Sequence, residues 1–301
     1  MTFSSRPVLI VIAGPTASGK TQLAADLALK LKTAVISADS RQIYREMKIG
    51  TAVPSNAILN RVKHYFIGHV GIHDYYNASM FEVEVLEMLK EIFTSSGYAI
   101  MAGGSGLYID AVCRGIDDLP TIDPEIRKNL MEKLSSGGLE NLRLEIKKVD
   151  PEYYRKADLK NPKRLLKALE VYYMTGKPYS SFCTQSSKQR DFEIVKFGLF
   201  PGMEILTRQI ETRTDEMMAQ GWLDEALALY PYRNLNALNT VGYKELFAYL
   251  DGAITLGQAV SLIKVNTRRY AKRQMSYFRR DKSITWLHPD EAFEKIYNIV
   301  S

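Results

Sequence analysis

A glycine-rich segment near the N-terminus carries the clearest chemical signal of the sequence. Residues 14–21 read GPTASGKT and match the pattern G-x-x-x-x-G-K-[ST]. In such a loop, backbone N–H groups surround phosphate oxygens at the positive end of a helix. Lys20 adds a point charge, and the Thr21 hydroxyl can bind Mg²⁺. The alternative is a tight strand-to-helix turn that holds no ligand. The predicted diphosphate-binding residues are Gly14, Pro15, Thr16, Ala17, Ser18, Gly19, Lys20 and Thr21.

Two further polar segments follow apolar runs of the sequence. Asp39 comes directly after a short apolar run, where it can hold Mg²⁺ through water, act as a general base, or cap a following helix. Residues 103–106, Gly-Gly-Ser-Gly, form a second glycine turn after another apolar run. Because ligands of open α/β sheets bind at the carboxyl ends of the strands, we expect both glycine turns to face one crevice, with the Ser105 hydroxyl available to a ligand.

The positive charge of the chain is concentrated in one segment. The formal net charge is 40 − 34 = +6. Residues 264–282 hold eight Lys or Arg against the single acid Asp281, a net +7, so the rest of the chain sums to −1. Arg268, Arg269, Lys272 and Arg273 fall on one flank of a predicted helix. The absence of acids in this segment favours phosphate contact over a solvated face, whereas Tyr270, Tyr277 and Phe278 are expected to pack inward.

The elements that position these residues follow from the apolar pattern. Val8–Ala13 is a continuous β-branched run before the first glycine turn, and residues 20–31 repeat apolar side chains at helical spacing. Further apolar runs at 34–37, 65–68, 98–102 and 192–200 are predicted strands, and helical stretches such as 80–93 separate them. This alternation predicts an α/β fold, a P-loop NTPase-like parallel sheet with helices on both faces. The rest of the C-terminal part is expected to be mostly helical.

The segment between residues 120 and 190 has a different pattern of apolar residues. It contains no strand-like run and reads as consecutive helices. Asn161 followed by Pro162 predicts the start of one helix, and Gly176 followed by Pro178 predicts its end. We therefore predict an all-helical domain at 120–190, inserted in a core formed by 1–119 and 191–301.

Composition sets the remaining limits. Of the 301 residues, 46% are hydrophobic and 25% are charged, which is typical of a globular chain and excludes a disordered or fibrous one. No apolar run has the length of a membrane helix, and two cysteines give no disulfide framework. We expect a cytoplasmic protein that does not act at a membrane.

Six blocks of the sequence, in this order, resemble the tRNA dimethylallyltransferase (isopentenyltransferase) family. The resemblance covers nearly the whole chain. The blocks are GPTASGKT, ADSRQIYREMKIGTAVPS, GGSGLYIDAVCRGIDDLP, NPKRLLKALEVYYMTGKP, VGYKELFAYLDG and NTRRYAKRQMSYFRRD.

The resemblance implies transfer of a dimethylallyl group from its diphosphate to N6 of adenosine 37, in tRNAs that read codons beginning with U. The products are N6-dimethylallyladenosine and diphosphate. The phosphate loop would then hold the leaving diphosphate, with Mg²⁺ near Thr21 as the cofactor. The partner would be the anticodon stem-loop, from which the adenine must be extruded, and the enzyme is expected to act as a monomer.

The resemblance also assigns roles to individual residues. Asp39 would accept the proton from N6, Thr16 would line the same site, and Ser105 stands where the family more often has threonine. Arg127 matches a position near the diphosphate, and Arg208 and Arg213 are further candidates for binding its charge. Lys163 and Lys167 replace Gln and Arg of a family pattern in which Arg164 is retained, so phosphate contact is kept and bidentate base reading by these two is put in doubt. The implied tRNA-binding residues are Asp39, Ser40, Arg41, Gln42, Lys163, Arg164, Lys167, Gly242, Lys244, Arg268, Arg269, Lys272 and Arg273.

Two other functions compete with this interpretation. A small-molecule kinase that uses ATP explains the phosphate loop but gives no reason for the basic segment. A nucleotide-dependent RNA-binding switch without catalysis predicts RNA affinity that nucleotide controls and no covalent change. We favour prenyl transfer to RNA, which the two glycine turns, the helical insertion, the basic segment and the resemblance support.

Overall fold

The computed structural model describes residues 6–117, 119–120, 122–183 and 187–301. The chain divides into two compact units, which are treated separately below. Unit 1 comprises Met1–Arg114 and Gln189–Ser301, and unit 2 comprises Gly115–Lys188. The insertion expected at 120–190 covers nearly the same residues as unit 2.

Unit 1 is built on a six-stranded parallel sheet with the strand order β3-β2-β4-β1-β5-β6. This confirms the predicted fold class. The strands are β1 (Val8–Ala13), β2 (Val35–Ser37), β3 (His64–Tyr65), β4 (Tyr98–Gly103), β5 (Glu193–Leu199) and β6 (Ile284–Leu287). The helices of this unit are α1 (Lys20–Leu31), α2 (Asn56–Arg61), α3 (Ala78–Ser95), α4 (Gly106–Arg114), α8 (Met203–Ala219), α9 (Trp222–Leu229), α10 (Tyr243–Leu250), α11 (Leu256–Phe278) and α12 (Pro289–Val300).

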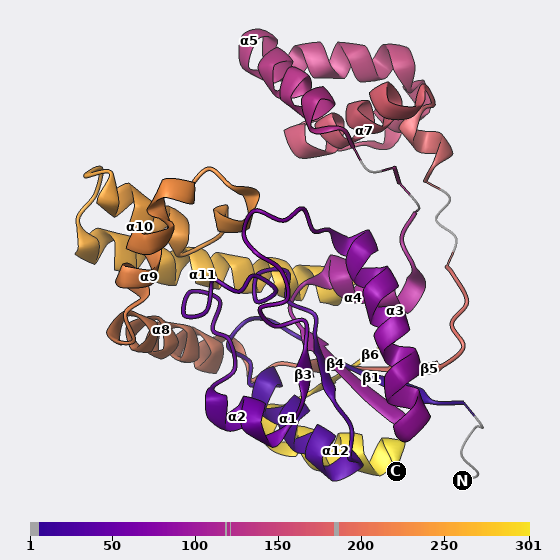
Figure 1. The fold of residues 1–301 in the computed structure, drawn as a ribbon, viewed down its shortest axis with the longest axis vertical. Helices are drawn as coiled ribbons and strands as arrows, with labels where there is room; N and C mark the ends of the chain where they lie inside the picture. Colours follow the sequence, from indigo (N-terminus) through magenta and orange to yellow (C-terminus); the bar gives the residue numbers. More distant parts are fainter. Residues whose placement is uncertain (1–5, 118, 121, 184–186) are drawn as a thin grey trace. The chain divides into compact units, whose positions relative to one another are not determined.

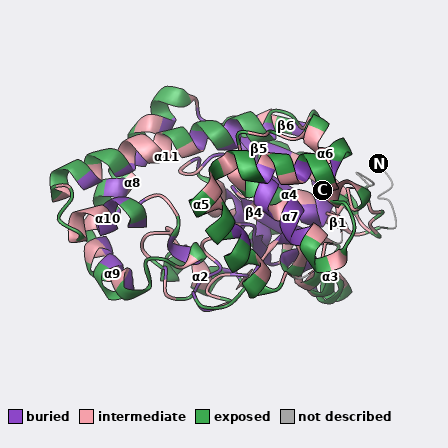
Figure 2. Cartoon of the chain, turned by 90° about the horizontal axis from the view of Figure 1, so that it is seen from above, coloured by how far each residue is buried: buried purple, intermediate pink, exposed green. Residues whose placement is uncertain are grey.

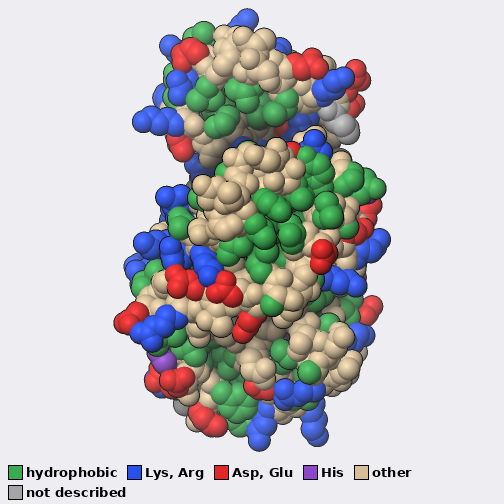
Figure 3. All heavy atoms as spheres, turned by 90° about the vertical axis from the view of Figure 1, so that its left-hand side faces the viewer, with side chains coloured by type: hydrophobic (Ala, Val, Ile, Leu, Met, Phe, Trp, Pro, Cys, Tyr) green, Lys and Arg blue, Asp and Glu red, His purple; other side chains and the backbone are tan. Residues whose placement is uncertain are grey.

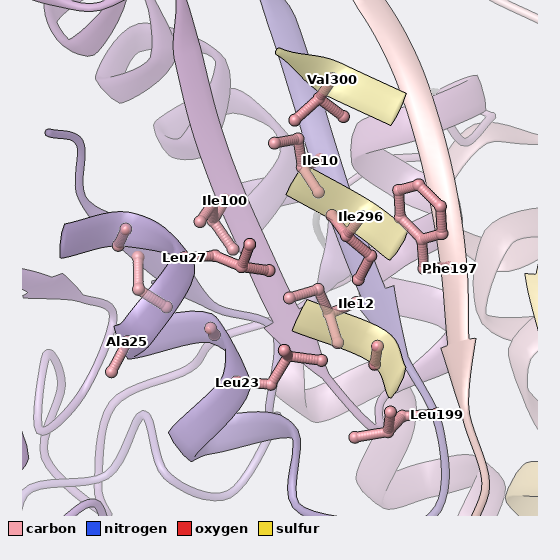
Figure 4. Packing of buried hydrophobic residues seen from close by; sticks show 14 of the residues in the cluster. Ile10, Ile12, Leu23, Ala25, Leu27, Ile100, Phe197, Leu199, Ile296 and Val300 are labelled. Atoms are coloured by element: carbon pink, nitrogen blue, oxygen red, sulfur yellow. The ribbon is translucent and has the colours of Figure 1, made fainter. Parts of the chain in front are cut away.

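Helices cover both faces of the sheet (Figure 1). On one face, Ile10 and Ile12 of β1 pack with Leu27 of α1 and Ile296 of α12 in a continuous apolar cluster (Figure 4). On the other face lie α3 and α4. Figure 2 shows the central strands buried and the outer faces of the helices exposed. Two covered faces explain why β1 reads as an unbroken apolar run and not as an alternating one.

Two strand predictions were wrong in detail. The run expected as a strand at 65–68 forms a strand only at His64–Tyr65, because Phe66 and Gly68 take left-handed conformations with φ of 64° and 59°. Strand β6 was missed and interpreted as part of a mostly helical region. It is a four-residue edge strand, and such a short run carries little periodic signal.

Unit 2 consists of helices. They are α5 (Pro124–Val149), α6 (Pro151–Lys156), α7 (Pro162–Thr175) and the short 3₁₀ helix η1 (Tyr179–Ser181). The predicted caps of α7 are confirmed: Asn161 accepts a hydrogen bond from the backbone N–H of Lys163, and Gly176 ends the helix with φ of 70°. Leucines from α5 and α7 form a separate apolar core.

Within the described part of the chain, no helix combines the length and the apolar character that crossing a bilayer requires.

Candidate functional site

The phosphate loop connects the buried end of β1 to the first turn of α1. Gly14 has φ of 152°, and a Cβ there would lie 2.6 Å from the carbonyl oxygen of Leu199. Ala17 and Gly19 also have positive φ, 65° and 88°. These turns bend the chain into a cradle below the N-terminus of α1.

Lys20 lies folded over this loop. Its Nζ donates to the carbonyl oxygen of Pro15 at 2.5 Å and to Oγ of Ser18 at 3.3 Å. Burial and, to a smaller extent, the charge of Arg213 lower the pKa of Lys20 to about 7, a shift that Asp39 opposes. Two cations therefore converge on the loop, an arrangement that an anion would stabilise.

The loop lines a cavity of about 590 Å³, called here the phosphate-loop cavity. Arg213 of α8 donates from Nη2 to Oγ1 of Thr16 at 2.5 Å. Arg208, one turn earlier on α8, also lines the cavity, but its exposed guanidinium pairs with Glu204. Of the two arginines predicted to bind the diphosphate, Arg213 contacts the phosphate loop and Arg208 does not. Among the residues of the cavity wall are Thr16–Gln22, Asp39, Gln42, Gly103, Gly104, Arg208, Arg213 and Gln274.

A second cavity of about 520 Å³ also has Asp39 in its wall. We call it the Tyr270 cavity. Tyr270 and Arg273 of α11 line it, with the Arg273 guanidinium 5.8 Å from the centre of the Tyr270 ring. Thr16, Asp39 and Arg213 belong to the walls of both cavities. Asp39 therefore stands where a cradle for phosphate meets a space with an aromatic wall.

Asp39 caps a turn and not a helix. Its Oδ1 accepts the backbone N–H groups of Arg41 at 2.8 Å and of Gln42 at 3.3 Å, and no helix follows. The expectation that it could be a helix cap was wrong, because the chain turns back toward Val70 at Tyr44. Oδ2 accepts no hydrogen bond from any residue that the structure describes, and this leaves it available to a ligand.

The residues next to Asp39 bind other parts of unit 1. Arg41 donates from Nη1 to the carbonyl oxygens of Asn236 and Ala237, both at 2.9 Å. Gln42 donates from Nε2 to the carbonyl oxygens of Thr51 and Ala52, at 3.1 and 3.0 Å. Both amide protons of Gln42 are thus used inside the protein. For these two predicted tRNA contacts, the structure shows a role in fixing the Asp39 turn.

The second glycine turn leaves β4 beside the phosphate loop, since Ala13 of β1 and Gly103 of β4 are partners in the sheet. Ser105 accepts the backbone N–H of Ser40 at 2.9 Å, and the hydroxyls of the two serines lie 3.2 Å apart. Its hydroxyl therefore holds the turn that carries Asp39. The two cavity walls described above do not include Ser105.

Two residues near the site were missed by the sequence analysis. Gln274, a buried amide on α11, lines the phosphate-loop cavity and bonds to both glycine turns. Glu225 on α9 accepts the backbone N–H groups of Lys48, Ile49 and Gly50, each at 2.8 Å. It thereby fixes the loop whose next two residues line both cavities. A glutamine inside a basic helix and a lone glutamate give no local signal of these contacts.

In the fold, acidic side chains from another part of the chain pair with two cations of the basic segment. Lys264 pairs with Asp215 at 2.6 Å, and Arg268 pairs with Glu211, both acids being on α8. The prediction that these cations lack compensating acids was therefore wrong for Arg268, because the fold brings to it an acid that lies 57 residues away in the sequence. On the face shown in Figure 3, Lys and Arg side chains lie beside Asp and Glu.

The other predicted contacts of α11 are exposed. Arg269 donates to Oδ1 of Asn266 at 3.2 Å, and Lys272 has no acidic partner among the described residues. Phe278 is buried as expected, whereas Tyr277 is about a third exposed, at 37%, and its hydroxyl bonds to Asp110.

Gly242 and Lys244 lie at the start of α10. A Cβ on Gly242, whose φ is 97°, would lie 2.0 Å from Cζ2 of Trp222. Packing against this ring therefore requires glycine there. Lys244 is exposed and lines the Tyr270 cavity.

Four of the predicted site residues belong to unit 2. Arg127 of α5 pairs with the buried Glu170 of α7 at 3.4 Å, so its guanidinium has a partner within that unit. Lys163 and Arg164 are exposed at the start of α7, and Lys167 is half-buried. Their roles toward the diphosphate and the tRNA stay predictions.

A family model described as IPP transferase matches residues 42–281. The chain belongs to the IPP transferase family. A tRNA dimethylallyltransferase 1 of Bacteroides thetaiotaomicron is 50% identical over 288 residues, 96% of this chain and 94% of the relative.

Solved structures of the family are also similar to this member. The full-length tRNA isopentenylpyrophosphate transferase of Bacillus halodurans is 32% identical with a TM-score of 0.70, covering 98% of this chain and 96% of that chain. A eukaryotic dimethylallyltransferase acting on tRNA is 25% identical with a TM-score of 0.82, covering 97% of this chain and 78% of that chain.

The residues of this family member fit a magnesium ion only when substrate oxygens complete its shell. Thr21 and Asp39 both line the phosphate-loop cavity and offer oxygen ligands. Across the described residues, no three His, Cys, Asp or Glu side chains gather as a ready metal site. Magnesium bound through phosphate oxygens and water, with one or two protein oxygens, is the usual arrangement at phosphates.

Proposed function

We propose that this enzyme transfers a dimethylallyl group from dimethylallyl diphosphate to N6 of adenosine 37 in tRNAs that read codons beginning with U. The observation that carries the proposal is the junction at Asp39. A cradle for phosphate and a cavity with an aromatic wall meet at this one carboxylate, in a chain of the IPP transferase family. The two substrates would enter from opposite sides and react beside Asp39.

The phosphate-loop cavity suits the diphosphate of the donor. The loop amides and the ammonium of Lys20 would hold its oxygens, and Arg213 lies within reach because it already binds Thr16. As the allylic C–O bond breaks, negative charge grows on the departing diphosphate. Preorganised donors in a partly buried site stabilise that charge in the transition state. Magnesium, when bound near Thr21, would neutralise further charge on the leaving group.

The Tyr270 cavity suits the adenine. An adenine extruded from the anticodon loop could stack on the Tyr270 ring. Its N6 attacks the allylic carbon, a C–N bond forms, and the electron pair of the C–O bond leaves with diphosphate. Asp39 takes the proton that N6 loses, and its Oδ2 is the oxygen that no described residue occupies. The products are N6-dimethylallyladenosine and diphosphate.

Cations around the Tyr270 cavity would bind the backbone of the tRNA anticodon stem-loop. Lys244 and Arg273 line the cavity, and Lys272 lies exposed beside Arg273 on α11. In unit 2, Lys163 and Arg164 offer exposed charges for the same backbone. Contacts of this kind fix position without reading sequence.

The test is transfer to RNA by the purified enzyme. It is incubated with Mg²⁺, dimethylallyl diphosphate and unmodified tRNA, and the tRNA is digested and analysed by mass spectrometry. We expect one five-carbon addition on the adenosine 3′-adjacent to the anticodon. A parallel reaction with ATP and no isoprenoid donor should leave the RNA unchanged and release no ADP. ATP turnover with unmodified RNA would instead support a kinase.

A further inference from the structure

Gln274 joins the two glycine turns of the site. Its Oε1 accepts the backbone N–H of Thr16 at 2.8 Å, and its Nε2 donates to the carbonyl oxygen of Gly104 at 2.9 Å. The amide is buried, with 6% of the residue exposed. Because the Thr16 N–H can only donate and the Gly104 carbonyl can only accept, the orientation of this amide is unambiguous.

The space around this amide is adapted to it. A Cβ on Gly104 would lie 2.1 Å from Nε2 of Gln274, so any larger residue at this position would displace the amide. The next turn of α11 shows the same close approach, because a Cβ on Gly106 would lie 2.2 Å from Cε1 of Tyr277. Helix α11 thus packs closely against the second glycine turn at two residues, Gln274 and Tyr277, which lie three residues apart.

The bonds of Gln274 connect to Arg213 through Thr16, and to the Asp39 turn through Gly104, Ser105 and Ser40. Thr16 is bound by Arg213 on the diphosphate side. Gly104 is followed by Ser105, whose hydroxyl holds Ser40 next to Asp39. One neutral side chain therefore lies between the group that would hold the leaving diphosphate and the group that would take the proton.

We propose that Gln274 is a positioning residue for the transfer reaction: its amide fixes the distance between the phosphate loop and the turn that carries Asp39. The inference rests on the proposed function. Only an uncharged side chain that both accepts and donates fits here, since an ionised glutamate could not donate to Gly104 and an aliphatic chain could do neither. Small displacements of reacting groups are costly, and a shift of about 1 Å can reduce a rate about 10²-fold.

The first experiment compares Gln274→Met with Met275→Ala, a matched control on the same helix that is also buried and bonds to neither turn. Melting temperature, tRNA affinity, kcat and KM for dimethylallyl diphosphate are measured. We expect Gln274→Met to lower kcat about tenfold or more with little change in KM or tRNA affinity, and the control to keep its kcat. A kcat within about twofold of the wild type would overturn the proposal.

The second experiment uses Gln274→Glu and does not depend on the first variant folding. A protonated carboxyl both donates and accepts as the amide does, whereas an ionised one cannot donate. We expect the rate of this variant, divided by that of the wild type, to rise as the pH falls from about 8 to about 5.5. A ratio that does not change with pH would contradict the role. A wild-type enzyme that leaves tRNA unmodified contradicts the proposed function and removes this inference with it.

Discussion

The two cavities that meet at Asp39 are built in opposite ways. The phosphate-loop cavity has one continuous stretch of its wall, Thr16–Gln22 with Lys20, from the phosphate loop and the start of α1. The Tyr270 cavity takes its wall from several elements, among them the Asp39 turn, α8, α10 and α11, and Asp39 and Arg273 in this wall are 273 − 39 = 234 residues apart. A site for a small charged group can be encoded in one loop, whereas a space for a planar base has to be assembled from several elements.

The largest effect is expected from removing the charge at the centre of the loop. Lys20→Met should lower the transfer rate roughly 10²–10³-fold, because a preorganised cation on the leaving group is lost. Single-turnover transfer to tRNA measures the effect. The matched control is Lys264→Met, since Lys264 is paired with Asp215 and lines neither cavity, and it should change the rate less than about twofold. An equal loss of transfer rate in the two variants would contradict a specific role of Lys20 in the phosphate loop.

Asp39, the carboxylate that lines both cavities, should show the next largest effect. Asp39→Asn keeps an oxygen for the Arg41 N–H but cannot take a proton, so we expect a rate about 10²-fold lower. Binding of tRNA and of magnesium pyrophosphate should persist, as titration of each ligand would show. An unchanged rate would remove the assignment of Asp39 as the base.

Helix α11 carries exposed cations beside the Tyr270 cavity as well as cations that are paired with acids of α8. Variants of the two kinds show which of them bind tRNA. Replacing Lys272 and Arg273 by alanine should weaken tRNA binding about tenfold and reduce the slope of log affinity against log salt by about one to two. The pair Lys264→Ala with Arg268→Ala should have a smaller effect, because acids of α8 already neutralise both side chains. Filter binding over a salt series measures both. Equal slopes for the two double variants would show that pairing with the acids of α8 has no effect on tRNA binding by these cations.

The smallest expected effect is the uptake of a proton by Lys20 when an anion binds in the phosphate-loop cavity. Burial and Arg213 hold the pKa of Lys20 at about 7 without an anion, and bound pyrophosphate should raise it. At pH 8, above this pKa, Lys20 is mostly neutral before binding, so binding should add a proton to Lys20; at pH 6, where Lys20 is already mostly charged, this uptake should be smaller. Calorimetry in two buffers of different ionisation enthalpy measures this uptake. Lys20→Met should abolish it, and uptake that persists in that variant would assign the proton to another group.

The sequence by itself determined the parts that depend on neighbours along the chain. The pattern at 14–21 fixes a strand, a turn and helix α1, because glycine conformation and helical spacing are local properties. The caps of α7 at Asn161 and Gly176 follow for the same reason. The parallel sheet follows from apolar runs that alternate with helices.

Only the tertiary structure decided which distant residues meet. It brought Glu211 of α8 to Arg268, Glu225 to the backbone of the loop at 48–50, and Gln274 to both glycine turns. Each contact joins groups that lie from 57 to 258 residues apart, and a pairing of that kind leaves no period or motif in the chain. Packing of α8 against α9 and α11 sets these distances, and the environment of Asp39 exists only once that packing is formed.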